Sequence, residues 1–312
     1  MYYWRDFMEK DKIIPFLIIG IFSFVFGYFV GVSQPSYSEN IVIQYFKNPK
    51  PYSVEDVSLP ITYYGTVCGK YIGYQIPPHN VNEEARNSFY RYFKLKDKDP
   101  KKAESCLKRA LFLTEYLISQ SQKEQVEVNG RTISFIIWTY NFEFPLYNLS
   151  RGWRGALCQA GCLKTLYLAY LATGDERYLK YANLALNAFE VPVEKGGLLK
   201  LRYYKNNSYY WFPEYASENP PYVLNGFITA TLWIGEFGDK TNNSEARYLY
   251  RRGLKSIETF LPMYDAGNWS YYDALGHKCN RHYEHLQRLQ MLWLYNITKK
   301  EMYLKYYEKW KE

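Results

Sequence analysis

Residues 153–189 read WRGALCQAGCLKTLYLAYLATGDERYLKYANLALNAF, and the pattern of this stretch indicates the fold class. Apolar residues recur at helical spacing in its first half and again in its second half. The polar turn at Gly174 and Asp175 separates the two runs. The stretch therefore predicts two helices joined by a short turn, which is a helical hairpin.

The same arrangement recurs along the chain. Three further segments run from a polar turn into a helix: LKDKDPKKAESCLKRAL (95–111), FGDKTNNSEARYLYRRGLKSI (237–257) and YNITKKEMYLKYYEKW (295–310). Helical spacing also marks residues 82–95, 223–237 and 282–296. Such repetition argues for stacked hairpins that share one core, in sufficient number to close a ring. We therefore expect a mainly α fold with an (α/α) toroid-like helical-hairpin domain over residues 81–312.

The residues before this domain have a different character. Residues 33–80 contain short apolar and β-branched runs broken by Pro and Gly, such as ITYYGTVCGKYIGYQIP (61–77). Such runs predict a few short strands. We expect a linker with a small β-containing segment here.

A membrane-spanning helix is expected further upstream. Residues 13–32 read IIPFLIIGIFSFVFGYFVGV and carry no charge, which is long enough to cross a hydrocarbon core of roughly 30 Å. Basic residues lie in 1–12, and the next Lys or Arg is Lys47, so the positive-inside rule predicts a cytoplasmic N-terminus and an extracytoplasmic domain. A cleaved signal peptide is the alternative, but the stretch is long for one and lacks a clear small-residue cleavage site.

The amino-acid composition indicates which kinds of partner the protein is expected to bind. Aromatic residues make up 20% of the chain, with 35 Tyr, and their flat apolar faces suit carbohydrate as well as protein interfaces. The net charge of +8 comes from scattered lysines rather than blocks, so it does not favour nucleic acid. A polyanionic sugar or an anionic membrane surface fits it equally well. The five cysteines do not form a disulfide pattern, and Cys158 and Cys162 are expected to be buried thiols.

One aromatic segment is expected to be a functional loop. Residues 208–221 read SYYWFPEYASENPP, which is too rich in proline for regular structure and lies between two helical hairpins. Loops presented by a rigid scaffold often carry function. We expect this loop to face a cleft.

Four blocks in one order carry a family resemblance: PLYNLSRGWRGALCQAGCLKTL (145–166), WFPEYASENPPYVLNGF (211–227), LPMYDAGNWSYYDALGH (261–277) and HYEHLQRLQML (282–292). Over about residues 145–310 the chain resembles the C-terminal domain of D-glucuronyl 5-epimerases, which act on heparosan-type glycosaminoglycan precursors. The resemblance implies a helical toroid-like catalytic domain that inverts carbon 5 of a hexuronate within a polymer, without a cofactor.

The resemblance also assigns residues to roles. The family's Glu-Tyr pair falls on Glu214 and Tyr215, and the tyrosine of its Tyr-Asp pair falls on Tyr272, so these three are the expected catalytic residues. The family's final Tyr-His-x-x-His motif is altered, because Arg281 takes the place of its tyrosine and Tyr283 follows two residues later. The expected substrate-binding residues are Trp211, Asn225, His277, Arg281, His282, Tyr283 and His285.

Other functions compete with this reading. A uronate polysaccharide lyase would form the same carbanion and then expel the 4-linked sugar, and a glycan-binding cell-envelope protein would keep the fold without the chemistry. A zinc site at Cys279 and the neighbouring histidines matches no standard ligand spacing, so no metal is expected. The expected partners are an acidic polysaccharide, a membrane through the N-terminal helix and no nucleic acid; the sequence also admits a homodimer.

Overall fold

The structure is a computed structural model that describes residues 58–311. The chain divides between Thr114 and Glu115 into two compact units. More than half of the described residues are helical, as the apolar spacing predicts. All the residues that we assign to the candidate site lie in the second unit.

The first unit begins with four two-residue strands in two nested antiparallel pairs, β1 with β4 and β2 with β3. Their bounds are Thr62–Tyr63 (β1), Thr66–Val67 (β2), Lys70–Tyr71 (β3) and Tyr74–Gln75 (β4). Helix α4 (Pro78–Leu95) follows, and proline in its first turn loses no helical hydrogen bond. Helix α5 (Pro100–Gln120) crosses the boundary between the units. The Arg109 side chain on α5 donates to Glu84 on α4 at 2.8 Å, which ties the two helices together.

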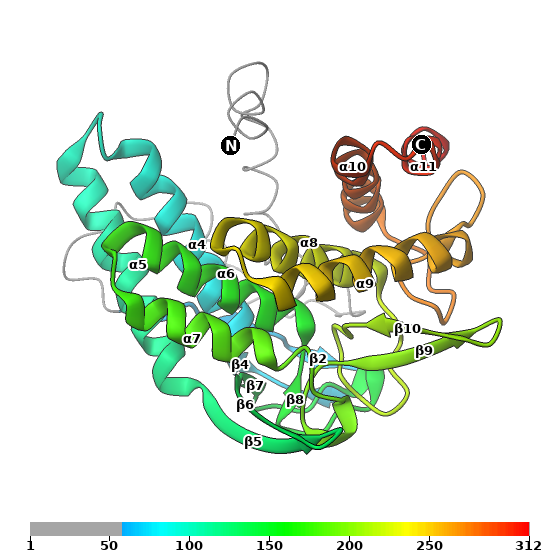
Figure 1. Cartoon of the computed structure of the whole chain (residues 1–312), viewed down its shortest axis with the longest axis horizontal. Helices are drawn as coiled ribbons and strands as arrows, with labels where there is room; N and C mark the ends of the chain where they lie inside the picture. Colours follow the sequence, from blue (N-terminus) through cyan, green and yellow to red (C-terminus); the bar gives the residue numbers. More distant parts are fainter. Residues whose placement is uncertain (1–57, 312) are drawn as a thin grey trace. The chain divides into compact units, whose positions relative to one another are not determined.

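The second unit contains three helical hairpins (Figure 1). They are α6 (Ala156–Thr173) with α7 (Glu176–Asn187), α8 (Leu224–Thr241) with α9 (Ser244–Phe260), and α10 (Arg281–Thr298) with α11 (Glu301–Lys309). The turn after α6 uses Gly174 at φ 73°, and Asp175 caps α7 by accepting from the Arg177 N–H at 2.8 Å. Helix α8 packs against both α6 and α10. The hairpin predicted from residues 153–189 is therefore present.

Helix α6 is apolar on nearly all sides because it lies inside the unit, between α7 and α8. The Gln159 side chain on this helix is buried, and backbone carbonyl groups accept hydrogen bonds from its amide. The Gln159 Nε2 donates to the carbonyl oxygens of Ile136 at 2.8 Å and of Ala185 at 2.9 Å. Cys158 and Cys162 on this helix are buried, as the sequence predicts.

Short antiparallel strand pairs fill the segments between the hairpins. They are β5 (Gln122–Val128) with β6 (Arg131–Ile137), β7 (Thr139–Tyr140) with β8 (Trp153–Arg154), and β9 (Lys200–Tyr204) with β10 (Asn207–Trp211). The first four residues of the expected loop at 208–221 are thus part of a strand. The cause is a tight turn in which Lys205 and Asn206 both have positive φ, which pairs the aromatic run with β9.

The expected fold class needs a correction. Among residues 58–311, no helix combines the length and the apolar character that a membrane crossing requires, and the expected span at 13–32 lies outside the described residues. Within the second unit, α8 packs against both α6 and α10, so the three hairpins stand in the order α6–α7, α8–α9 and α10–α11. Periodicity fixes helices and their hairpins, but ring closure depends on contacts between hairpins that it does not encode.

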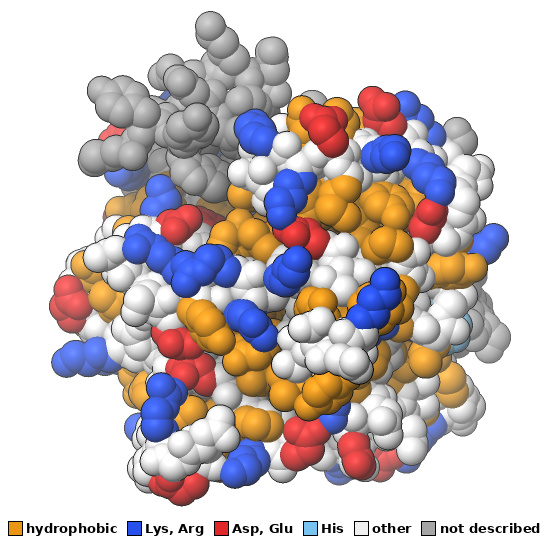
Figure 2. Space-filling model, turned by 45° about the vertical axis from the view of Figure 1, so that its right-hand side comes forward, with side chains coloured by type: hydrophobic (Ala, Val, Ile, Leu, Met, Phe, Trp, Pro, Cys, Tyr) orange, Lys and Arg blue, Asp and Glu red, His pale blue; other side chains and the backbone are white. Residues whose placement is uncertain are grey.

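The positive charge is not gathered in one patch on the face drawn in Figure 2. Lys and Arg side chains there alternate with acidic and hydrophobic ones. Several Lys and Arg side chains of the second unit form ion pairs, for example Arg131 with Glu190 at 2.6 Å. This distribution agrees with the scatter of lysines along the sequence.

Candidate active site

The segment that follows β10 is held between two helix N-termini. The Ala156 N–H at the start of α6 donates to the Pro213 carbonyl at 2.9 Å, and the Ala216 N–H donates to the Arg154 carbonyl at 3.0 Å. At the start of α8, the Leu224 N–H donates to the Tyr272 carbonyl at 3.1 Å. The first turns of the two helices therefore position both the Glu214-Tyr215 pair and Tyr272.

Two glycines make room for Glu214. A Cβ added at Gly155 would lie 2.4 Å from the Glu214 carbonyl oxygen, and one added at Gly226 would lie 1.9 Å from its Oε2 atom. Any larger residue at either position would displace the glutamate. Gly226 lies in the first turn of α8, so the carboxyl group packs directly onto the backbone of that turn.

Glu214 is a buried carboxyl group with tyrosines as partners. Its side chain is hydrogen-bonded to Tyr215 and Tyr272, while its Oε2 atom is buried with no hydrogen-bond partner among the described residues. Burial raises the pKa of Glu214 to about 8, and the two tyrosine hydrogen bonds oppose that shift. A carboxyl group that titrates near neutral pH can take up and release a proton under ordinary conditions.

Four tyrosines surround this carboxyl group. The rings of Tyr147 and Tyr215 lie 4.6 Å apart, and those of Tyr272 and Tyr283 lie 4.7 Å apart. Burial raises the pKa of Tyr215 and of Tyr272 well above 10, and the Glu214 charge raises both further. The phenols are therefore protonated at neutral pH, and each is a proton donor unless a base takes its proton.

Tyr147 is fixed by a buried aspartate that also contacts a surface histidine. The Tyr147 hydroxyl donates to Asp273 Oδ2 at 3.0 Å, and the His277 Nδ1 lies 2.7 Å from the same oxygen. Asp273 is fully buried, whereas the His277 side chain is 59% exposed. Burial and the Asp273 charge raise the pKa of Tyr147. His277 is thus connected to the tyrosine cluster through Asp273.

The sequence analysis missed Tyr147 and Asp273. Both stand in the quoted blocks, Tyr147 in PLYNLS and Asp273 directly after Tyr272. Spacing gave no signal for Tyr147, because it meets Asp273 across 126 positions of sequence. The Tyr-Asp pair did offer a signal for Asp273, since a carboxylate beside an expected catalytic tyrosine is a candidate second-layer partner.

The expected residues of α10 separate into two groups. Tyr283 is buried against Tyr272, and the half-buried His282 ring lies 5.4 Å from the Tyr283 ring. Arg281 and His285 are exposed. Where the family motif has its tyrosine, Arg281 thus lies at the surface, and Tyr283 supplies the phenol that joins the cluster.

Two expected substrate-binding residues are buried near α8. Asn225 is 1% exposed, and its Oδ1 atom has no hydrogen-bond partner among the described residues. Trp211 has no exposed surface, and its ring stacks on Phe227 at 3.9 Å and receives the Arg202 guanidinium at 5.3 Å. Trp211 therefore packs in the core and offers no free face to a sugar.

Cys279 and the neighbouring histidines do not form a metal-binding cluster among the described residues. Residues 58–311 contain no group of three or more His, Cys, Asp or Glu side chains that could hold a metal ion. Cys279 is buried, and the Ser270 hydroxyl donates to its Sγ at 3.4 Å. Burial raises the pKa of this thiol, which disfavours the thiolate that zinc needs.

Comparison with known proteins identifies the family of this chain. Residues 131–312, more than half of the chain, match the family model described as D-glucuronyl C5-epimerase C-terminus. The chain belongs to this family. The uncharacterized protein MJ1128 of Methanocaldococcus jannaschii is 78% identical over 305 residues, which cover 98% of this chain and 99% of that protein. The D-glucuronyl C5-epimerase of Caenorhabditis elegans is 30% identical over 183 residues, which cover 52% of this chain and 29% of the worm protein.

Proposed function

We propose that this protein inverts carbon 5 of a hexuronate within a polysaccharide. One observation carries the proposal: the buried Glu214 carboxyl group is hydrogen-bonded to two tyrosines, Tyr215 and Tyr272. Membership of the family and the similarity to the worm epimerase support the reaction class. The identity of the polymer is part of the proposal and is tested below.

The chemistry sets two requirements. Carbon 5 of a uronate is alpha to the carboxylate, so its proton leaves only if a base is positioned and the resulting enolate charge is stabilised. Inversion also needs a second group on the opposite face, which returns a proton to the carbon. A pair of tyrosines that share one carboxylate meets both requirements.

The proposed proton transfers balance. The oxygen of one tyrosine accepts the carbon 5 proton while its own hydroxyl proton passes to ionised Glu214. The other tyrosine then donates its hydroxyl proton to the opposite face of carbon 5 and recovers a proton from Glu214. Glu214 begins and ends the cycle ionised, both tyrosines begin and end protonated, and no external acid or base is consumed.

The surroundings support this cycle. The phenols have pKa values well above 10, which makes them poor bases alone, so the neighbouring carboxylate is needed to take their protons. A pKa of about 8 for Glu214 lies between that of an ordinary carboxyl group and that of a phenol, which suits a group that both accepts and returns protons. Tyr147 lies beside Tyr215 and Tyr283 lies beside Tyr272, and a phenol hydroxyl that reaches the enolate would stabilise its charge by a hydrogen bond.

The test is isotope exchange at carbon 5. The protein is incubated in deuterated water with non-sulfated and with N-sulfated heparosan, and deuterium at carbon 5 is measured by NMR and mass spectrometry. We expect incorporation together with a change of configuration, and a loss of roughly 100-fold or more in Tyr215→Phe and in Tyr272→Phe. Tyr271→Phe is the matched control, because Tyr271 is the adjacent tyrosine and has no counterpart role in the cycle.

Each other outcome points elsewhere. Exchange that survives both phenylalanine variants would remove the tyrosine pair from the mechanism. An unsaturated product that absorbs ultraviolet light would identify a lyase. Binding to a panel of uronate polymers without exchange would replace the enzyme with a glycan-binding protein.

A further inference from the structure

An open groove lies beside the tyrosine cluster, within the second unit. Its volume is about 630 Å³, inside the range of roughly 300–1,000 Å³ that is usual for ligand sites. It shares walls with the cluster, because the lining residues Asn148 and Ala216 directly follow Tyr147 and Tyr215. The ring of Trp153, which also lines the groove, lies 5.7 Å from the Tyr215 ring.

A guanidinium group without a partner lies in this groove. Arg154 is half-buried, and within residues 58–311 its side chain has no hydrogen bond or ion pair; its Nε atom is fully buried. A Cβ added at Gly196 would meet the Arg154 Nη1 atom at 3.4 Å, so the guanidinium lies over the backbone of that glycine. A partly desolvated charge with no counter-ion costs free energy, which an anionic ligand would offset.

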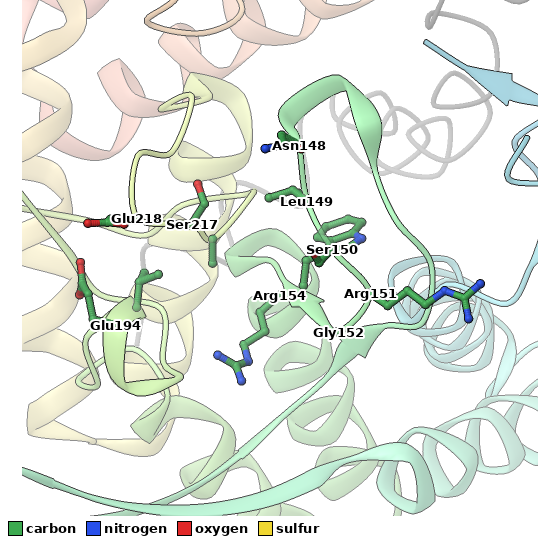
Figure 3. A pocket seen from close by; sticks show the side chains of 12 residues that line it. Asn148, Leu149, Ser150, Arg151, Gly152, Arg154, Glu194, Ser217 and Glu218 are labelled. Carbon is green, nitrogen blue, oxygen red and sulfur yellow. The ribbon is translucent and has the colours of Figure 1, made fainter. Parts of the chain in front are cut away.

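The acidic residues of the groove do not neutralise Arg154. Glu194 is paired with Lys200, and Glu218 is exposed and forms no ion pair among the described residues. Figure 3 shows the Arg154 side chain extending into the groove from β8, whereas that of Arg151 extends to the opposite side. The groove thus presents one unused guanidinium together with carboxylates that accept hydrogen bonds.

The other lining groups fit a hydroxylated ligand. Ser150, Ser217 and the Asn148 amide are short polar groups, and carboxylates such as Glu218 accept hydrogen bonds from sugar hydroxyls. Arginine binds carboxylate and sulfate in two-pronged fashion because its planar N–H donors match the geometry of these anions. A sugar that carries an anionic group satisfies both sets of residues.

We propose that this groove binds the sugar next to the reacting uronate and that Arg154 holds a carboxylate or a sulfate of the polymer there. The inference rests on the proposed function for the identity of the neighbouring site, and it adds a specificity-determining residue outside the tyrosine cluster.

Oligosaccharide length and Arg154→Gln test the inference together. Heparosan-type oligosaccharides of increasing length are assayed for deuterium incorporation, and their binding is measured separately by calorimetry. We expect KM and Kd to fall when the oligosaccharide becomes long enough to fill the groove, and Arg154→Gln to lose that gain by roughly 10- to 100-fold, with kcat within about twofold. Arg154→Lys, which keeps the charge but not the planar fork, should lie between the two.

Controls identify the anion and guard against misfolding. Arg251→Gln removes the same charge from an exposed position on α9 that does not line the groove, and it should keep Kd within about twofold. Reducing the uronate carboxyl groups to alcohols tests whether Arg154 binds a carboxylate, and comparing N-acetylated with N-sulfated chains tests whether it binds a sulfate. The anion that Arg154 binds is the one whose removal makes the Kd of wild type equal to that of Arg154→Gln. Thermal unfolding of each variant separates a binding defect from a folding defect, and Arg154→Lys serves if Arg154→Gln does not fold.

The outcomes separate this inference from the proposed function. Exchange with the same length dependence in wild type and in Arg154→Gln would overturn the groove assignment and leave the epimerase intact. Arg154-dependent binding without any exchange would keep the groove and overturn the epimerase. Absence of both binding and exchange on all chains would overturn both.

Discussion

Glu214 and Glu284 are both buried carboxyl groups of the second unit, but their hydrogen-bond partners differ. Glu284 Oε2 accepts from the Ser270 N–H at 2.8 Å and from the Ser270 hydroxyl at 2.6 Å. Glu214 has the phenols of Tyr215 and Tyr272 as partners. Burial raises the pKa of both carboxyl groups, and their hydrogen bonds oppose the shift in both.

The difference lies in what the partners can do. A backbone N–H does not give up its proton, so Glu284 fixes the segment around Ser270 onto α10 and has a structural role. Phenol hydroxyls can exchange their protons with a carboxylate, so the Glu214 arrangement can carry protons. Burial alone therefore does not mark a catalytic carboxyl group; titratable partners do.

The largest expected effect contrasts the two glutamates directly. Glu214→Gln should lower carbon 5 exchange by roughly 100- to 10,000-fold, because an amide cannot accept the phenol proton. Glu284→Gln should keep kcat within about threefold but lower the free energy of unfolding by about 1–3 kcal/mol, since it places an amide N–H₂ where an acceptor is buried. Exchange rates and denaturant unfolding measure the two effects. If Glu214→Gln kept its exchange activity, the proposed proton-carrying role of Glu214 would be wrong.

Filling the space beside Glu214 is expected to have the next largest effect on the exchange rate. Gly226→Ala places a methyl group where Oε2 now lies, so the carboxyl group must move by an ångström or more, and such a displacement costs roughly 100-fold in rate. The matched control is Gly253→Ala, which also adds a crowded methyl group but away from Glu214. Its Cβ would lie 2.6 Å from Thr231 Cγ2, where α9 packs against α8. The control should lose about 1–3 kcal/mol of stability with its kcat preserved. Equal kcat values in both variants would contradict the positioning role of Gly226.

The buried carboxyl group of Glu214 also predicts a pH dependence of stability. The Glu214 pKa is about 8 in the folded protein and near 4.5 when exposed, so the folded state binds the proton more tightly. The stabilisation from this proton is complete below about pH 4.5 and is lost as pH rises toward 8, at about 1.4 kcal/mol per pH unit at most. The stability difference between wild type and Glu214→Gln, measured by urea unfolding from pH 5 to 9, should therefore fall with pH and level off above 8. A difference that is independent of pH would show that Glu214 keeps an ordinary pKa. Glu284 titrates equally in both proteins and cancels.

The inward position of Tyr283 could have been predicted from the helical period of the sequence. On α10 the buried residues follow the 3.6-residue period of a helix; they are Tyr283, Glu284, Leu286, Gln287, Gln290, Met291 and Leu294. Positions two apart on a helix point about 200° from each other. Extending the apolar stripe back to Tyr283 would therefore have placed it inward and Arg281 outward, without reference to the family motif.

The sequence by itself determined the helices and turns of the second unit, because these depend on residues close together in the chain. The family resemblance, and not periodicity, pointed to the Glu214-Tyr215 pair. Only the tertiary structure decided that Gly226 receives the Glu214 carboxyl group, that Tyr147 meets Asp273, and that Arg154 has no partner within residues 58–311. These contacts join residues separated by 12 to 126 positions, and the packing of hairpins sets them. Local periodicity records which face of a helix is buried, but not what that face meets.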